Sequence, residues 1–409
     1  MKTIYNKVIT TCAIVAMAIS CDSFSNLKDV KIVEPVSVAI TTQLNIGDAP
    51  IPVSLNVRLL SYSENQEYNV KANVQGEIIV NGIIPGIYNI MVTQEETHES
   101  STYFYSGSSG TVTLLDNNQR FTISISVAKA GALIFKEIYY CGSSAPTGGS
   151  YFRDQFYEIY NNSETVQNVR NLAIALLAPS PATASPPIWP DDVKDDYVFA
   201  ASMWQVPDDK DYPLLPGESI IIAQMADDHQ KENLFPASPV NLITAEFETF
   251  VANTSIIQDN PAINMHLAFW PSPTPQWLTT VFGGAYAIYN PGEPLTPGDP
   301  TNEVTPVGQT TKYLKIPIAD VIDAVEALGN MIDINLKRLP IILDAGAVSV
   351  GGTYQNKSVS RIIKEVKEDG RVVYQDTNNS IDDFQINEPP MIRRNGAKAP
   401  SWNTWINNY

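Results

Sequence analysis

The sequence has few of the side chains that most often carry chemistry. Its 409 residues include 3 histidines and 3 cysteines. His98, His229 and His266 are far apart along the chain, whereas a zinc site or a histidine-activated nucleophile needs such residues to converge. The sequence also has no G-x-S-x-G, H-E-x-x-H, Walker or C-x-x-C motif. We therefore expect a protein that is not an enzyme.

Positive charge is scarce as well. The chain has 26 lysines and arginines against 44 acidic residues, which gives a formal net charge of -18. Phosphate recognition needs a basic face, so nucleic-acid binding is disfavoured. Hydrophobic residues make up 44% of the chain and charged residues 17%, a balance typical of a folded body and not of a disordered one.

Acidic residues gather most densely at Asp191, Asp192, Asp195 and Asp196. Carboxylate oxygens are ligands for Ca²⁺, which makes these four a weak candidate metal site. No EF-hand spacing accompanies them, and a solvated acidic surface is the alternative. No other cofactor is indicated.

Long apolar runs are absent except at the start of the chain. Lys2 and Lys7 precede an apolar run over residues 8–19, which is too short for a finished transmembrane helix and is typical of a secretory signal. The run ends in Ala18-Ile19-Ser20-Cys21, which resembles the lipobox of bacterial lipoproteins. The resemblance implies a signal peptide over residues 1–20, acylation of Cys21 and a polar tether over residues 21–35. An ordinary signal or an uncut anchor are the alternatives.

These assignments leave Cys141 without a partner. Cys12 would be removed with the signal and Cys21 would carry lipid, so no intrachain disulfide remains possible. We expect Cys141 to be a structural thiol at the end of a strand.

Strand-like runs divide the chain into two predicted domains. The first domain, residues 36–128, alternates apolar and polar residues in short runs, as in 53–59, which indicates an antiparallel sandwich. Its expected strands are 36–44, 53–62, 68–72, 77–80, 87–93, 101–105, 111–115 and 121–127. The stretch around Pro85-Gly86 and Tyr88 resembles carboxypeptidase-regulatory-like and prealbumin-like domains.

The second predicted domain covers residues 131–409. Runs 132–140, 155–163, 172–177 and 212–223, with closing segments 357–363, 370–374 and 376–384, resemble a lamin-tail domain. That resemblance implies an immunoglobulin-like sandwich, so the fold prediction is all-β, with two immunoglobulin-like β-sandwich domains. Arg361 is expected to form a structural ion pair with Asp376 or Asp383. Residues 319–329 have helical spacing and predict one short amphipathic helix.

Long proline-rich insertions set the second domain apart from a compact lamin-tail domain. They span residues 179–211, 227–283 and 290–306. They carry four of the 6 tryptophans, which are our candidate ligand-binding residues because rigid loops with large aromatic side chains often bind: Trp189, Trp204, Trp270 and Trp277. The alternative is that these tryptophans seal an enlarged core.

Taken together, these features resemble an uncharacterised lipoprotein family of the Bacteroidota, often found beside TonB-dependent receptors. The resemblance implies an outer-membrane, lipid-anchored protein, at the cell surface or on the periplasmic face. It further implies an accessory ligand-capture or interaction protein for a TonB-dependent receptor, with a metal chelate or siderophore as a possible ligand. A structural or adhesive surface protein is the alternative, and the sequence names no ligand.

Overall fold

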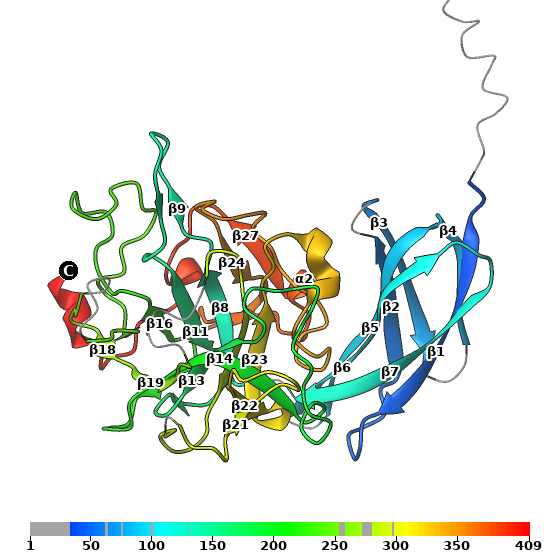
Figure 1. Ribbon diagram of the computed structural model, residues 1–409. Coiled ribbons are helices and arrows are strands. Elements are labelled where there is room, and N and C mark those ends of the chain that lie inside the picture. Colours follow the sequence, from blue (N-terminus) through cyan, green and yellow to red (C-terminus); the bar gives the residue numbers. More distant parts are fainter. Residues whose placement is uncertain are drawn as a thin grey trace, which may run out of the picture.

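The computed structural model describes residues 33–409 except 62–63, 75–76, 99–100, 130, 253–257, 272–279 and 297. Nearly all its regular structure is β-strand, which confirms the all-β prediction (Figure 1). The predicted signal, Cys21 and most of the tether lie outside the described residues. In the described part of the chain, no helix has the length and apolar character that a membrane crossing requires.

The first domain is one curled seven-stranded sheet in the order β3-β2-β5-β6-β7-β1-β4. It forms the blue-to-cyan body on the right of Figure 1. β1 pairs in parallel with β7, and the other pairs are antiparallel. The strands are β1 (Val36–Asn45), β2 (Ser54–Ser61), β3 (Gln66–Asn73), β4 (Glu77–Ile83), β5 (Gly86–His98), β6 (Ser101–Leu114) and β7 (Gln119–Lys129).

Alternating side chains form the core of this domain. Leu55, Val57 and Leu59 on β2 are buried, and the residues between them are more exposed. Two runs expected to be separate strands, 101–105 and 111–115, are parts of the single strand β6. A Cβ at Gly107 would lie 2.4 Å from the Ser124 carbonyl oxygen, so the glycine between the two runs permits close pairing and does not mark a turn.

The second domain contains two larger sheets that enclose an apolar core. The first has the order β18-β17-β16-β11-β8-β24-β27, and the second has β21-β22-β14-β13-β20-β23 with β19 paired to β14. The strands of the first sheet are β8 (Leu133–Tyr139), β11 (Phe156–Asn161), β16 (Ser219–Ala223), β17 (Phe247–Glu248), β18 (Ile263–Asn264), β24 (Ser358–Arg361) and β27 (Phe384–Asn387). Those of the second are β13 (Ala173–Leu177), β14 (Tyr197–Gln205), β19 (His266–Phe269), β20 (Ala285–Tyr289), β21 (Glu303–Val304), β22 (Tyr313–Pro317) and β23 (Val321–Glu326).

Short elements complete the second domain. Three two-stranded ribbons pair β9 (Ser143–Ser144) with β10 (Ser150–Tyr151), β12 (Gln167–Asn168) with β15 (Pro213–Leu214), and β25 (Ile363–Val366) with β26 (Val372–Tyr374). The α-helix α2 spans Ser380–Asp383, and 3₁₀ helices occupy Ile318–Asp320, Met331–Leu336, Arg394–Gly396 and Thr404–Asn408.

The prediction of a helix at residues 319–329 is wrong. After the 3₁₀ turn Ile318–Asp320 the chain forms β23, which pairs antiparallel with β20. Pairing with β20 satisfies its backbone, and Asp323 takes a buried partner, so tertiary contacts outweigh the helical spacing. The short α-helix of this domain is instead α2, where Asn379 accepts a hydrogen bond from the Ile381 N–H.

The predicted insertion 179–211 also contains a core strand. β14 pairs with β13 and β22 and lies inside the second sheet. Because proline-rich sequence flanks it on both sides, the sequence analysis assigned this segment to an insertion, although its residues are mostly buried.

Polar contacts between described residues join the domains. Arg58 of β2 binds Asp382 of α2, and the Lys364 ammonium lies 2.6 Å from a Glu95 carboxylate oxygen. The Ser106 hydroxyl donates to the Ile341 carbonyl at 3.2 Å. The first-domain residues in these contacts, Arg58, Glu95 and Ser106, therefore mark the side of that domain that faces the second domain.

Candidate functional site

The candidate site is a cavity of about 700 Å³ between the two domains, here called the inter-domain cavity. Val127 at the end of β7 contributes from the first domain. The second domain contributes Asp195 and Asp196 before β14, residues 317–324 around the start of β23, and residues 342–343. Its size falls in the range of small-molecule sites.

Local hydrogen bonding fixes the acidic rim. The Lys194 and Tyr197 N–H groups donate to the Pro190 and Val193 carbonyls, at 3.0 and 3.2 Å, so the chain turns just before β14. The Ile318 N–H then donates to the Asp196 carbonyl at 2.9 Å. Strand pairing of Tyr197 with Pro317 continues this link, so the aspartates and the start of β23 share one wall.

The lining combines apolar walls with carboxylates. Ile318, Ile322 and Leu343 supply apolar surface, whereas Asp195 and Asp196 are exposed at the rim. No lysine or arginine is among the described residues that line the cavity. A cation does lie near the rim, because the Lys315 ammonium is 5.4 Å from the centre of the Tyr197 ring.

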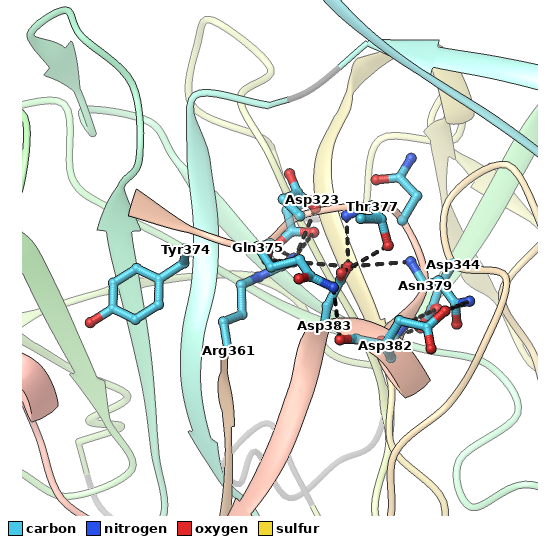
Figure 2. A network of polar contacts seen from close by, with 12 residues as sticks. Asp323, Asp344, Arg361, Tyr374, Gln375, Thr377, Asn379, Asp382 and Asp383 are labelled. Atoms are coloured by element: carbon cyan, nitrogen blue, oxygen red, sulfur yellow. Dashed lines mark hydrogen bonds and ion pairs between the residues drawn. The ribbon is translucent and has the colours of Figure 1, made fainter. Parts of the chain in front are cut away.

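Behind the cavity lies a buried ion cluster, the Arg361 network, which consists of Arg361, Asp323, Asp376 and Asp383. Figure 2 shows Arg361 with Asp323 and Asp383. The guanidinium lies 2.9 Å from Asp323, 3.0 Å from Asp376 and 3.2 Å from Asp383. Its remaining donors reach the Phe135 and Gln375 carbonyls at 3.0 and 2.9 Å. The expected pairing of Arg361 with Asp376 or Asp383 is confirmed for both, and Asp323 is a third partner that was not expected.

Three carboxylates share one guanidinium, which leaves the network rich in negative charge. Burial raises the pKa of Asp323 to about 7 and that of Asp383 to about 6, although Arg361 opposes both shifts. Burial disfavours the charge of Arg361, but the three aspartates outweigh this effect and raise its pKa. Because these carboxyls keep their protons more readily than exposed aspartates, the network gives the back wall less negative charge than three ionised carboxylates would.

Further hydrogen bonds hold this wall in place. Asp383 accepts from the N–H and the hydroxyl of Thr377, both at 2.8 Å (Figure 2). Asp344 accepts from the Ser380 N–H and hydroxyl at 2.9 and 2.6 Å. Asn378, which lines the cavity, donates to the Ile342 carbonyl at 3.0 Å. The network thus fixes the lining instead of offering free polar groups to it.

None of the three candidate tryptophans that the structure describes, Trp189, Trp204 and Trp270, lines the cavity. Trp204 is fully buried in the core between the sheets, which excludes it as a contact residue and agrees with the core-sealing alternative. Trp189 is partly exposed and stacks on Phe199 with a ring separation of 3.8 Å. Trp270 is partly exposed, and Trp277 lies outside the described residues.

The four candidate metal-binding aspartates separate into two pairs. Asp191 forms an ion pair with Lys194 at 2.6 Å, and Asp192 is exposed nearby. Asp195 and Asp196 line the cavity instead. Among the residues that the structure describes, no group of three histidine, cysteine or carboxylate side chains is placed to hold a metal ion.

Cys141 lies two residues beyond β8 and is fully buried. Its thiol approaches the Lys357 carbonyl at 3.2 Å, and burial raises its pKa, so the reactive thiolate is disfavoured. This agrees with the structural role expected from the sequence.

Side chains typical of hydrolases do approach one another near Cys141. Asp154 accepts hydrogen bonds from Ser143 and, at 2.7 Å, from Ser238. His229 contacts Tyr151 at 3.0 Å and the Met225 carbonyl at 2.9 Å, and not Ser143. Ser143, Asp154 and His229 are all fully buried, so this cluster does not form an accessible nucleophile and base.

Sequence reasoning missed most of the cavity. Its walls come from segments as far apart in the sequence as Val127 and Asn378, and the apolar residues involved resemble ordinary core positions. The sequence did contain one signal: Asp323 and Glu326 are the charged residues in the otherwise apolar run 321–328, and a charged residue in such a run usually has a buried partner.

A second hollow of about 600 Å³ lies on another side of the interface. Thr102, Lys364 and Asp376 are among its lining residues, so Asp376 connects it to the Arg361 network. Lys364 is already paired with Glu95 there.

These features define an all-β protein of two domains with an acidic cavity between them. A family described as "Protein of unknown function (DUF4876)" matches residues 215–391. The chain is also similar to a solved DUF4876 family protein from Bacteroides thetaiotaomicron VPI-5482, with 38% identity over 90% of this chain and 99% of that chain and a TM-score of 0.64. This chain belongs to the DUF4876 family. No curated protein matches it.

Proposed function

We propose that this chain is a non-enzymatic envelope lipoprotein that captures a small ligand in the inter-domain cavity and presents it to a TonB-dependent outer-membrane receptor. The observation that carries the capture step is the cavity itself, about 700 Å³ in volume and lined from both domains. A site between domains is a frequent location for ligands, because both domains can contribute contacts.

The charge of the lining selects the class of ligand. The exposed carboxylates of Asp195 and Asp196 at the rim favour a positive charge in the cavity. The apolar walls favour a ligand with a hydrophobic body. A cationic or neutral amphipathic molecule, including a metal chelate without negative charge, therefore fits better than an anionic siderophore.

The anchor and the receptor partnership rest on the sequence. The lipobox-like segment before Cys21 supports attachment to the outer membrane. The receptor partnership is supported only by the resemblance to lipoproteins found beside TonB-dependent receptors.

Binding can be tested with three probes that share one apolar ring system and differ in charge. They are 1-naphthylmethylammonium, 1-naphthylmethanol and 1-naphthoate, titrated into the purified full chain by calorimetry. We expect saturable binding that is tightest for the cation and weakest for the anion. The preference should weaken as salt is added, because exposed carboxylates are screened.

A matched pair of variants locates the site. Asp195→Asn with Asp196→Asn removes two charges from the rim and should abolish the preference for the cation. Asp191→Asn with Asp192→Asn removes two charges from the same loop but not from the lining, and should leave it intact. Equal effects of the two variants, or no saturable binding by any probe, would reject the cavity as the site and favour the structural or adhesive alternative.

Localisation needs separate tests. Cys21→Ala should leave an uncut precursor or release the body from membranes. Protease added to intact cells should degrade the body if it lies on the outer face, and full protection would reject receptor capture at the cell surface. Cross-linking in intact cells should join the chain to a TonB-dependent receptor, and the lack of such a product would remove that partner.

A further inference from the structure

One end of the first domain exposes an unusual group of apolar side chains. Val33, Ile84, Ile87 and Leu115, here called the N-terminal pole, have exposed fractions of 61%, 44%, 53% and 62%. Their neighbours Tyr88 and Leu114 are each 1% exposed, so the inward-facing positions of these strands are filled and the four exposed residues are not needed for the core.

Strand register brings these residues together. Gly86 pairs with Leu114 and Ile87 with Thr113, so Ile87 and Leu115 are diagonal neighbours on the outer face of the β5–β6 pair. Ile84 precedes the Pro85-Gly86 turn that opens β5. Val36 pairs with Ile83, which places Val33, three residues earlier, beside the same turn.

The pole is also where the chain enters the domain. β1 begins at Val36, and in Figure 1 this end lies away from the second domain. Residues 22–35 separate the candidate lipid-bearing Cys21 from β1 and span at most about 50 Å when extended. An anchor at Cys21, or an uncut apolar run over residues 8–19, would hold this pole closer to the bilayer than the inter-domain side.

We propose that the N-terminal pole is a membrane-contact surface that rests on the lipid bilayer to which the chain is anchored. The proposal rests on the membrane anchor of the proposed function. A short tether keeps the local concentration of membrane surface high, so a patch too small to bind membranes alone can stay in contact once anchored. The inter-domain cavity then faces away from the bilayer, toward a partner.

Charge decides the kind of lipid. Glu34 and Asp116 flank the apolar side chains, and Arg120 is already paired with Glu77. The pole therefore offers no net positive charge to an anionic headgroup. We expect a hydrophobic contact with uncharged or zwitterionic lipid that added salt does not weaken.

The test uses the acylated full chain in phosphatidylcholine vesicles, with the environment-sensitive fluorophore nitrobenzoxadiazole attached to one introduced cysteine. Cys141 is buried and Cys21 would be acylated, so the label reacts with the new thiol. Leu115→Cys and Ile87→Cys report on the pole. Ile332→Cys, at a 74% exposed position in the second domain, is the control.

We expect blue-shifted emission at positions 115 and 87 that a doxyl-labelled lipid quenches, and solvent-like emission at position 332. A further variant combines Ile87→Asp and Leu115→Asp with a label at Ile84→Cys. This chain should stay on the vesicles through its anchor, but its label should show solvent-like emission because the charged pole no longer contacts the lipid. Solvent-like emission at 115 and 87 from a chain that floats with the vesicles overturns the membrane contact alone. A chain that does not float overturns both the contact and the anchor.

Discussion

The two domains are stabilised by different kinds of core. In the first domain, the buried residues that the structure describes are apolar apart from Ser61, Asn89 and Ser106, and none is charged. The second domain buries several ion pairs, including Lys136 with Glu158, Arg338 with Glu326, and the Arg361 network. Alternation of side chains therefore specifies the first fold, whereas specific polar partners across long sequence distances help to specify the second.

The comparison also explains where a ligand site can form. A purely apolar core presents no charge to its surroundings, and the first domain gives the cavity only an apolar residue, Val127. The second domain carries buried charge up to its surface through Asp323. The acidic character of the cavity is thus a property of the second domain.

Loss of Arg361 should have the largest effect. Arg361→Met leaves three buried carboxylates without their cation and should lower the free energy of unfolding of the second domain by about 3–5 kcal/mol. The loss should shrink at acid pH, because the carboxylates then bind protons. Calorimetry that resolves the two domains measures this, and an unchanged second transition would contradict the role given to the network.

Truncation in the apolar core should come next. Leu59→Ala removes a fully buried side chain from β2 and should destabilise the first domain by about 2–4 kcal/mol. Unlike the Arg361 variant, its effect should be the same at pH 5 and pH 7, since no titrating group is involved. Chemical denaturation at the two pH values checks this, and a strong pH dependence would break the comparison between the cores.

Asp154 should make the stability of the second domain depend on pH. Burial raises the pKa of Asp154 to about 6, so the native state holds a proton that the unfolded chain releases near pH 4, and this contribution is lost as pH rises through 6. Asp154→Asn removes it, so the variant should lose about 2 kcal/mol more, relative to wild type, at pH 4.5 than at pH 7.

The pKa shift of His229 makes the stability of the second domain depend on pH in the opposite direction. Burial lowers the pKa of His229 to about 4, so its contribution is lost as pH falls below its unfolded value of 6.5. His229→Gln should therefore lose less, relative to wild type, at pH 4.5 than at pH 7. Parallel pH profiles for both variants would show that these groups do not titrate as stated.

The exposed ion pair between the domains should matter least. Lys364→Ala breaks the 2.6 Å contact with Glu95 and should cost about 0.2–1 kcal/mol, because solvent screens both charges. Thermal unfolding in low and high salt measures it. A loss well above 1 kcal/mol would mean that this contact between the domains contributes more to stability than an exposed ion pair should.

The sequence predicted much of the first domain because its strands follow the alternation of side chains. The sequence predicted the strands less well where tertiary contacts decide. The runs 101–105 and 111–115 belong to one strand, in which Gly107 permits close pairing, and residues 321–326 form a strand although their spacing is helical. Asp376 and Asp383 were matched to Arg361 from a local motif, but Asp323 was missed because its segment was taken as a helix.

The site was harder to predict than the fold. The tryptophans were predicted to bind a ligand because they are large aromatic residues in proline-rich segments. Trp204, however, belongs to a core strand inside one of these segments. Asp195 and Asp196 were selected as metal ligands, but their place is the rim of a cavity whose other walls come from distant segments. Such a cavity depends on how two domains meet, which no local pattern encodes.

Hydrogen exchange of the full chain, measured by mass spectrometry with and without 1-naphthylmethylammonium, tests the central claim most directly. If the inter-domain cavity is the ligand site, the cation should slow exchange in peptides covering 195–197 and 317–324, and not in those around 189 or at the N-terminal pole. Slower exchange elsewhere, with the cavity segments unchanged under saturating probe, would contradict the assignment.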